Sequence, residues 1–132
     1  MYYHGIIIDS SFTNLDFLKG IKFFAKRKSV NNPWTLYGIE VKEELIEDTL
    51  TKVQKFLKTD KNYYSHFYNK SNLIVVYKKR IFKIKPDVTT WKSAIDYGLK
   101  LNIPHEQLDF WPNRRQDEIH YFNASDFLNG SF

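Results

Sequence analysis

The sequence from Tyr63 to Lys85 reads YYSHFYNKSNLIVVYKKRIFKIK. It contains three short segments rich in aromatic and β-branched residues, the residue types that favour strands. The connections between these segments are only a few residues long, and connections of that length join neighbouring antiparallel strands. This part of the chain therefore predicts an antiparallel meander, with strands at Tyr63–Tyr68, Leu73–Tyr77 and Arg80–Lys85.

Two amphipathic helices flank the meander in the sequence. From about Glu43 to Lys58, apolar residues recur at intervals of three and four, with acidic residues in the early turns and lysines in the later ones. Both features are typical of a stable helix with one buried face. A second apolar stripe begins at Trp91 and continues to about Leu101, and Pro104 ends it.

Two further strands are expected before the first helix. Tyr3–Ile8 is rich in β-branched residues and is too short for a typical helix. Trp34–Val41 follows a turn at Asn31–Pro33 and carries bulky residues on both faces, which is typical of a strand inside a sheet. The pattern between Ile21 and Val30 fits either a helix or a strand, and the sequence leaves this choice open.

These elements predict an α+β fold. We expect an antiparallel or mixed sheet of about five strands with two main helices packed on one face. The β-α-β-β order in the middle makes a ferredoxin-like arrangement one candidate, although the additional strand and the C-terminal region do not fit it. We expect one domain over residues 1–112, followed by a polar tail or arm over residues 113–132, in which an edge strand is expected from Ile119, Tyr121 and Phe122.

The composition excludes several classes of protein. In 132 residues the chain has 11 Phe, 9 Tyr and 3 Trp but only 5 Gly and 4 Pro, a balance that excludes disordered and collagen-like chains. The lack of cysteine excludes disulfides, thiol nucleophiles and cysteine-ligated metals. The N-terminus has neither a basic leader nor a long apolar run, so we expect a cytoplasmic protein that does not interact with a membrane.

No catalytic motif is present. The sequence lacks the G-x-S-x-G elbow, the H-E-x-x-H motif, the G-x-G-x-x-G motif and the phosphate-binding loop. Its four histidines are far apart and do not have the spacing of metal ligands. We therefore expect no metal and no cofactor, and the sequence favours a protein that is not an enzyme.

One candidate ligand site lies in the aromatic segment of the meander. Period-2 alternation places Tyr64, His66 and Tyr68 on one face of their strand. Two hydroxyl groups and an imidazole on an apolar wall are suited to orienting a small ligand, and a neutral imidazole acts as an acid or a base near neutral pH. In the alternative interpretation, the tyrosines cover the sheet and their hydroxyl groups reach water.

Basic residues are unevenly distributed along this chain, whose net charge is +5. Two stretches contain no acid, and the candidates for nucleic-acid binding within them are Lys26, Arg27 and Lys28, and Lys78, Lys79, Arg80, Lys83 and Lys85. If both clusters share a face, we expect a surface that follows a phosphate backbone and stacks aromatic rings on bases. Alternatively, lysines on a hairpin protect the edge of a sheet from pairing with other chains.

A resemblance covers about residues 34–110. It rests on four segments, Tyr64–Asn69, Leu73–Tyr77, Thr90–Gly98 and Ile103–Phe110. In these segments the chain resembles a group of small uncharacterised prokaryotic proteins. The resemblance implies a compact α+β fold without an assigned activity, so no functional residue is transferred from it.

Three functions remain open after the sequence analysis. The first is a non-catalytic binding or protein-interaction module that associates with itself or with a protein partner, which the many aromatic residues favour. The second is nucleic-acid binding through the two basic clusters. The third is a small-molecule site or an enzyme that uses His66 and its neighbouring tyrosines.

Overall fold

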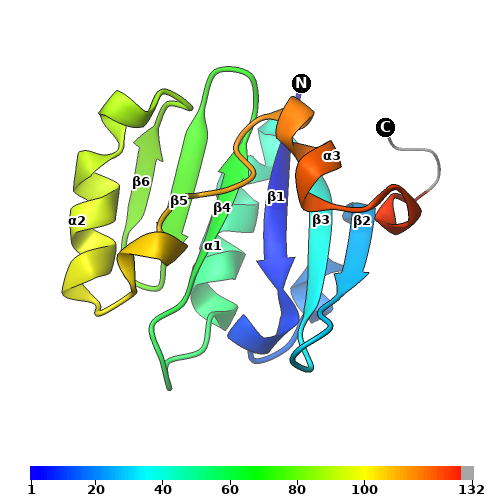
Figure 1. Ribbon diagram of the computed structural model, residues 1–132, viewed down its shortest axis with the longest axis horizontal. Coiled ribbons are helices and arrows are strands. Elements are labelled where there is room, and N and C mark those ends of the chain that lie inside the picture. The colour runs from blue at the N-terminus through cyan, green and yellow to red at the C-terminus, as the bar shows by residue number, and fades with distance from the viewer. Residues whose placement is uncertain (129–132) are drawn as a thin grey trace.

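The computed structural model describes residues 1–128 of the chain. Within this range six strands form one sheet in the order β2-β3-β1-β4-β5-β6, and every neighbouring pair is antiparallel (Figure 1). The expected α+β class is therefore confirmed. The strands are β1 (Tyr2–Ile8), β2 (Lys22–Lys28), β3 (Thr35–Lys42), β4 (Tyr64–Tyr68), β5 (Leu73–Tyr77) and β6 (Ile81–Ile84).

Helices connect and follow these strands. The α-helices of the described residues are α1 (Ile46–Phe56), α2 (Lys92–Lys100) and α3 (Glu118–Tyr121). The two helices expected from their apolar stripes correspond to α1 and α2, and the expected meander corresponds to β4, β5 and β6. No helix among residues 1–128 is long and apolar enough to cross a membrane.

The sheet has one strand more than the expected five, because the open segment between Ile21 and Val30 forms β2. The pairing of β2 with β3 shifts register between Phe23 and Ala25. An irregularity of this kind interrupts the regular alternation of side chains between the two faces of a strand. This accounts for the adjacent apolar residues in β2, which show no period of two. The ferredoxin-like arrangement is not confirmed, since three strands precede α1 here, whereas that fold begins with the order β-α-β.

The two main helices lie on opposite faces of the sheet, which corrects the expectation that both pack on one face (Figure 1). Side chains of β5 alternate between the faces, and all five of its residues are buried and apolar. A strand of this kind needs cover on both sides. Ile74 and Val76 pack in the cluster that contains α1, whereas Val75 and Tyr77 pack in the cluster that contains α2.

Residues 103–128 complete the cover of the second face. The segment crosses in front of the sheet from the end of α2 towards β2 (Figure 1), and the side chains of Phe110 and Phe122 are buried in the same cluster as α2. The edge strand expected from Ile119, Tyr121 and Phe122 is wrong, because Glu118–Tyr121 is helical as α3. An isolated bridge to Ala25 is instead made further along, at Phe127.

Two strand glycines make room for aromatic rings. A Cβ atom on Gly38 of β3 would lie 2.5 Å from the ring of Phe24, and one on Gly5 of β1 would lie 2.4 Å from the ring of Phe67. The ring of Phe24 is fully buried and stacks on the imidazole of His4 at a centroid distance of 4.0 Å. A Cβ at Gly38 would therefore require this buried ring to shift.

We therefore predict that Gly38→Ala lowers the free energy of unfolding by about 1–3 kcal/mol, the usual cost of overpacking a core. Urea denaturation measures this change. Ser93→Ala, on the exposed side of α2, is the matched control and is expected to change stability by less than about 0.5 kcal/mol. Equal stabilities of the two variants would contradict the close packing of Phe24 on β3.

Candidate functional site

The three residues of the sequence-predicted ligand site share one face of β4, and each of them makes a hydrogen bond to the protein. Residues 107–118 cover this face. His66 donates from Nε2 to the carbonyl oxygen of Pro112 at 2.7 Å, and the hydroxyl of Tyr68 donates to Oε2 of Glu118 at 2.5 Å. The hydroxyl of Tyr64 donates to the carbonyl oxygen of Gln107.

Burial sets the charge states of these groups. It lowers the pKa of His66 to about 4, against the opposing effects of the Pro112 hydrogen bond and the charge of Asp109. Burial also raises the pKa of Tyr64 and the pKa of Tyr68 well above their usual range, and the Glu118 carboxylate adds to the effect on Tyr68. All three side chains are therefore neutral near pH 7.

The buried neutral His66 predicts a pH-dependent stability. The unfolded chain takes up a proton on this histidine near pH 6.5, whereas the folded chain does so only near pH 4. Between pH 4 and 6.5 the unfolded state thus binds more protons than the folded state. The free energy of unfolding therefore has its highest contribution from His66 above pH 6.5 and decreases as the pH falls towards 4. We expect a loss on the order of 2–3 kcal/mol over the window from this residue.

Urea denaturation at several pH values across the window measures this loss. His66→Gln keeps a donor for Pro112 and removes the titrating group, so its stability is expected to depend less steeply on pH than that of the unmodified chain. The exposed His105→Gln is the control and should keep the original slope. A His66→Gln variant with an unchanged slope would rule out the neutral, buried state of His66.

The two basic clusters lie at opposite edges of the sheet, because β2 and β6 are its two outer strands. Five strand spacings separate them, which is about 24 Å. The clusters therefore do not join into one surface. Several members also have local partners, such as Arg27, whose guanidinium lies 4.7 Å from the ring of Tyr121, and Lys83, whose Nζ lies 2.8 Å from Oε2 of Glu47.

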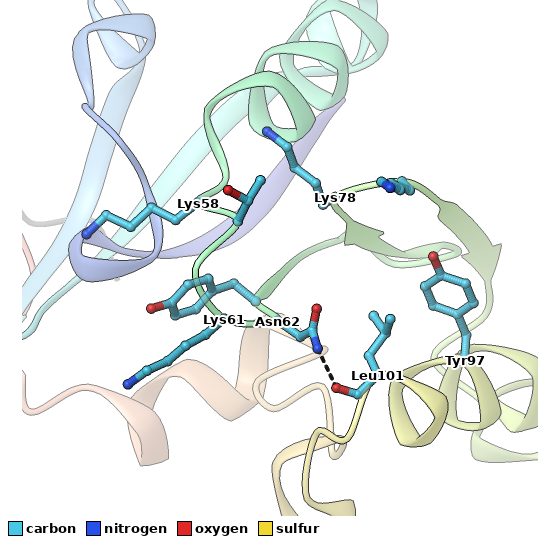
Figure 2. A pocket seen from close by; sticks show the side chains of 9 residues that line it. Lys58, Lys61, Asn62, Lys78, Tyr97 and Leu101 are labelled. Carbon is cyan, nitrogen blue, oxygen red and sulfur yellow. Dashed lines mark hydrogen bonds between the residues drawn. The ribbon is translucent and has the colours of Figure 1, made fainter.

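Two members of the second cluster, Lys78 and Lys79, line a pocket of about 260 Å³ (Figure 2). Three segments form its walls. They are the chain between α1 and β4, the turn between β5 and β6, and the second half of α2 with the residue that follows it. We name it the lysine pocket, and its lining residues are Lys58, Thr59, Lys61, Asn62, Tyr63, Lys78, Lys79, Tyr97 and Leu101.

Hydrogen bonds and ring contacts hold these walls together. Asn62 donates from Nδ2 to the carbonyl oxygen of Leu101 at 2.6 Å, which ties the loop to the end of α2 (Figure 2). The Nζ atom of Lys78 donates to the carbonyl oxygen of Lys55 at 2.8 Å, near the end of α1. The ring of Tyr97 packs on the buried ring of Tyr77 at a centroid distance of 4.9 Å.

The charge of the lysine pocket is entirely positive. Four of its nine lining residues are lysines, and none is an acid. Within residues 1–128, the ammonium groups of Lys58, Lys61 and Lys79 form no salt bridge. Figure 2 shows the side chains of Lys58 and Lys61 extending from the loop, on the side away from Tyr97. Within the described residues, no acid neutralises the charges of these three ammonium groups.

A buried polar cluster at the centre of the second face was not predicted from the sequence. His4 Nδ1 lies 2.6 Å from Oε2 of Glu118, and His4 Nε2 lies 2.9 Å from Oε2 of Glu40. Glu118 also accepts the hydrogen bond from Tyr68. The side chains of His4 and Glu118 are 3 % and 7 % exposed, so water does not compete for these bonds.

The neighbours of Glu40 in this cluster shift its pKa. Partial burial raises the pKa of Glu40, but the hydrogen bond and charge of His4, together with the charges of Lys22 and Arg115, hold it below its ordinary value. With its lowered pKa, the Glu40 carboxyl is ionised near pH 7 and accepts the hydrogen bond from Nε2 of His4. Among the described residues, no group of three or more His, Asp or Glu side chains is arranged to hold a metal ion.

No family model matches the chain, and no curated protein or solved structure is significantly similar to it. We therefore infer the function from the geometry of the chain's own residues. The lysine pocket is the candidate site, because His66 and Tyr68 on β4 are buried, Tyr64 is half-buried, all three bond to the protein, and the basic clusters lie apart. The sequence analysis named Lys78 and Lys79 but not the loop and helix that face them.

Proposed function

We propose that this chain is a non-catalytic binding protein whose lysine pocket takes a small ligand with a phosphate group. The observation that carries the proposal is the set of four lysines that line one hollow without an acid. Ammonium groups bind phosphate as point charges, and each has three hydrogen-bond donors. The lysines would neutralise a phosphate dianion.

The other lining residues are suited to the organic part of such a ligand. Tyr63, Tyr97 and Leu101 give the pocket apolar surface, while Thr59 and Asn62 contribute polar groups. Small-molecule sites combine apolar walls with a few polar groups in this way. At about 260 Å³ the pocket matches a compact ligand rather than a long polymer.

The lining residues support binding more than catalysis. None of them is a histidine, an aspartate or a glutamate, which are common general acids and bases. Asp60 belongs to the same loop but does not line the pocket.

Calorimetric titration tests this function with inorganic phosphate, adenosine monophosphate and adenosine. We expect both phosphate compounds to bind and adenosine to fail, because the contacts to charged groups supply most of the affinity. Binding should weaken as salt is added, since these lysines are at the surface. Absence of binding by both phosphate compounds at low salt would contradict the proposal.

Two double variants distinguish the pocket from general positive charge. Lys61→Gln with Lys79→Gln is expected to weaken phosphate binding by about tenfold or more, because each lost charged contact is a large part of a weak affinity. Lys19→Gln with Lys42→Gln removes the same charge from exposed positions outside the pocket and should leave binding within about twofold. Tighter binding of a single-stranded oligonucleotide, weakened equally by both double variants, would indicate a diffuse nucleic-acid surface instead.

A further inference from the structure

A second basic hollow, of about 630 Å³, lies at the other end of the meander. Its walls are the turn between β4 and β5, the chain between β6 and α2, and the segment just before α3. We name it the arginine pocket, and its lining residues are Asn69, Lys70, Lys85, Pro86, Asp87, Arg114, Arg115 and Gln116. It shares no residue with the lysine pocket.

The backbone of each wall is held by its own hydrogen bonds. Oδ1 of Asn69 accepts from the backbone nitrogens of Ser71 and Asn72, at 3.0 and 2.8 Å, and so fixes the turn that carries Lys70. The carbonyl oxygen of Lys85 accepts from Nε1 of the buried Trp91 at 2.8 Å.

The third wall is fixed in the same way. The backbone nitrogen of Asp117 donates to the carbonyl oxygen of Arg114 at 3.1 Å, and Nδ2 of the buried Asn113 donates to the carbonyl oxygen of Phe110 at 3.2 Å. The cationic side chains therefore extend from three fixed segments that are far apart in the sequence.

The charge balance of this hollow is strongly positive. It has four cationic side chains, Lys70, Lys85, Arg114 and Arg115, against the single carboxylate of Asp87. Within residues 1–128, none of the four cations forms a salt bridge. The Asp87 carboxylate accepts a hydrogen bond from the backbone nitrogen of Thr89 at 3.0 Å, where it caps a helical turn. It therefore offsets one of the four charges at most.

The composition of the walls selects the kind of anion. Guanidinium groups bind phosphate oxygens in pairs through their planar fork. No aromatic residue lines this hollow, so it lacks a surface on which a base would stack. We infer that the arginine pocket binds a ligand through two or more linked phosphates. The hollow has more cationic side chains than a single phosphate needs, and it is larger than the lysine pocket.

NMR titration of the isotope-labelled chain with pyrophosphate tests this site, with inorganic phosphate and succinate as comparison probes. We expect saturable shifts at the amides of residues 70, 85 and 114–116, with pyrophosphate binding about tenfold more tightly than either comparison probe. Equal affinity for succinate would mean a general dianion site and would overturn the inference. The absence of a saturable shift at these amides at millimolar pyrophosphate would overturn it as well.

Variants separate this site from the lysine pocket. Lys70→Gln with Arg114→Gln changes two exposed residues and should reduce pyrophosphate affinity by about tenfold or more. Lys61→Gln with Lys79→Gln, in the lysine pocket, is the control and should leave the shifts at the arginine pocket unchanged. If the control variant reduced the shifts at the arginine pocket as much as the first variant does, pyrophosphate would be bound by net charge alone. The inference would then fail, whether or not the lysine pocket binds phosphate.

Discussion

The hydrogen bonds of Glu118 with His4 and Tyr68 join the last helix to the sheet, across 114 residues of sequence in the case of His4. The sheet is apolar on both faces, so each face requires cover. One face receives the long amphipathic helix α1, whereas the other receives α2 and an extended segment with little regular structure. A buried carboxylate is costly unless it is paired, so Glu118 restricts this segment to one position on the sheet.

Both pockets follow from this arrangement. Each lies where a turn of the β4–β5–β6 meander meets a covering segment, at one end or the other of β5. Strand β5 and all of β4 except the half-buried Tyr64 are buried, so the charged residues of this region are confined to the turns and to the edge strand β6. Rigid strands thus position cationic side chains at both ends of the meander. The strands of the meander are apolar, and the side chains that we propose to bind ligands lie at its two ends.

The sequence predicts the meander, α1 and α2 because each has a regular apolar period. It did not identify β2, since Phe23, Phe24 and Ala25 are adjacent apolar residues at a register shift. Alternation along β4 did predict which residues share a face, but not that residues 107–118 cover them. Contacts such as His4 with Glu118, or Asn62 with the carbonyl oxygen of Leu101, depend on where distant segments meet, and local patterns carry no signal for that.

The central claim is that the segment from Phe110 to Phe122 is part of the core. Native-state hydrogen exchange of the amides in this segment tests it most directly. The account predicts that its bonded amides, such as that of Phe122, which donates to the Glu118 carbonyl at 2.9 Å, open only together with the sheet. Their protection should then lie within about tenfold of that of the β4 amides. Exchange at the rate of an unfolded chain, while β1 and β4 stay protected, would contradict it.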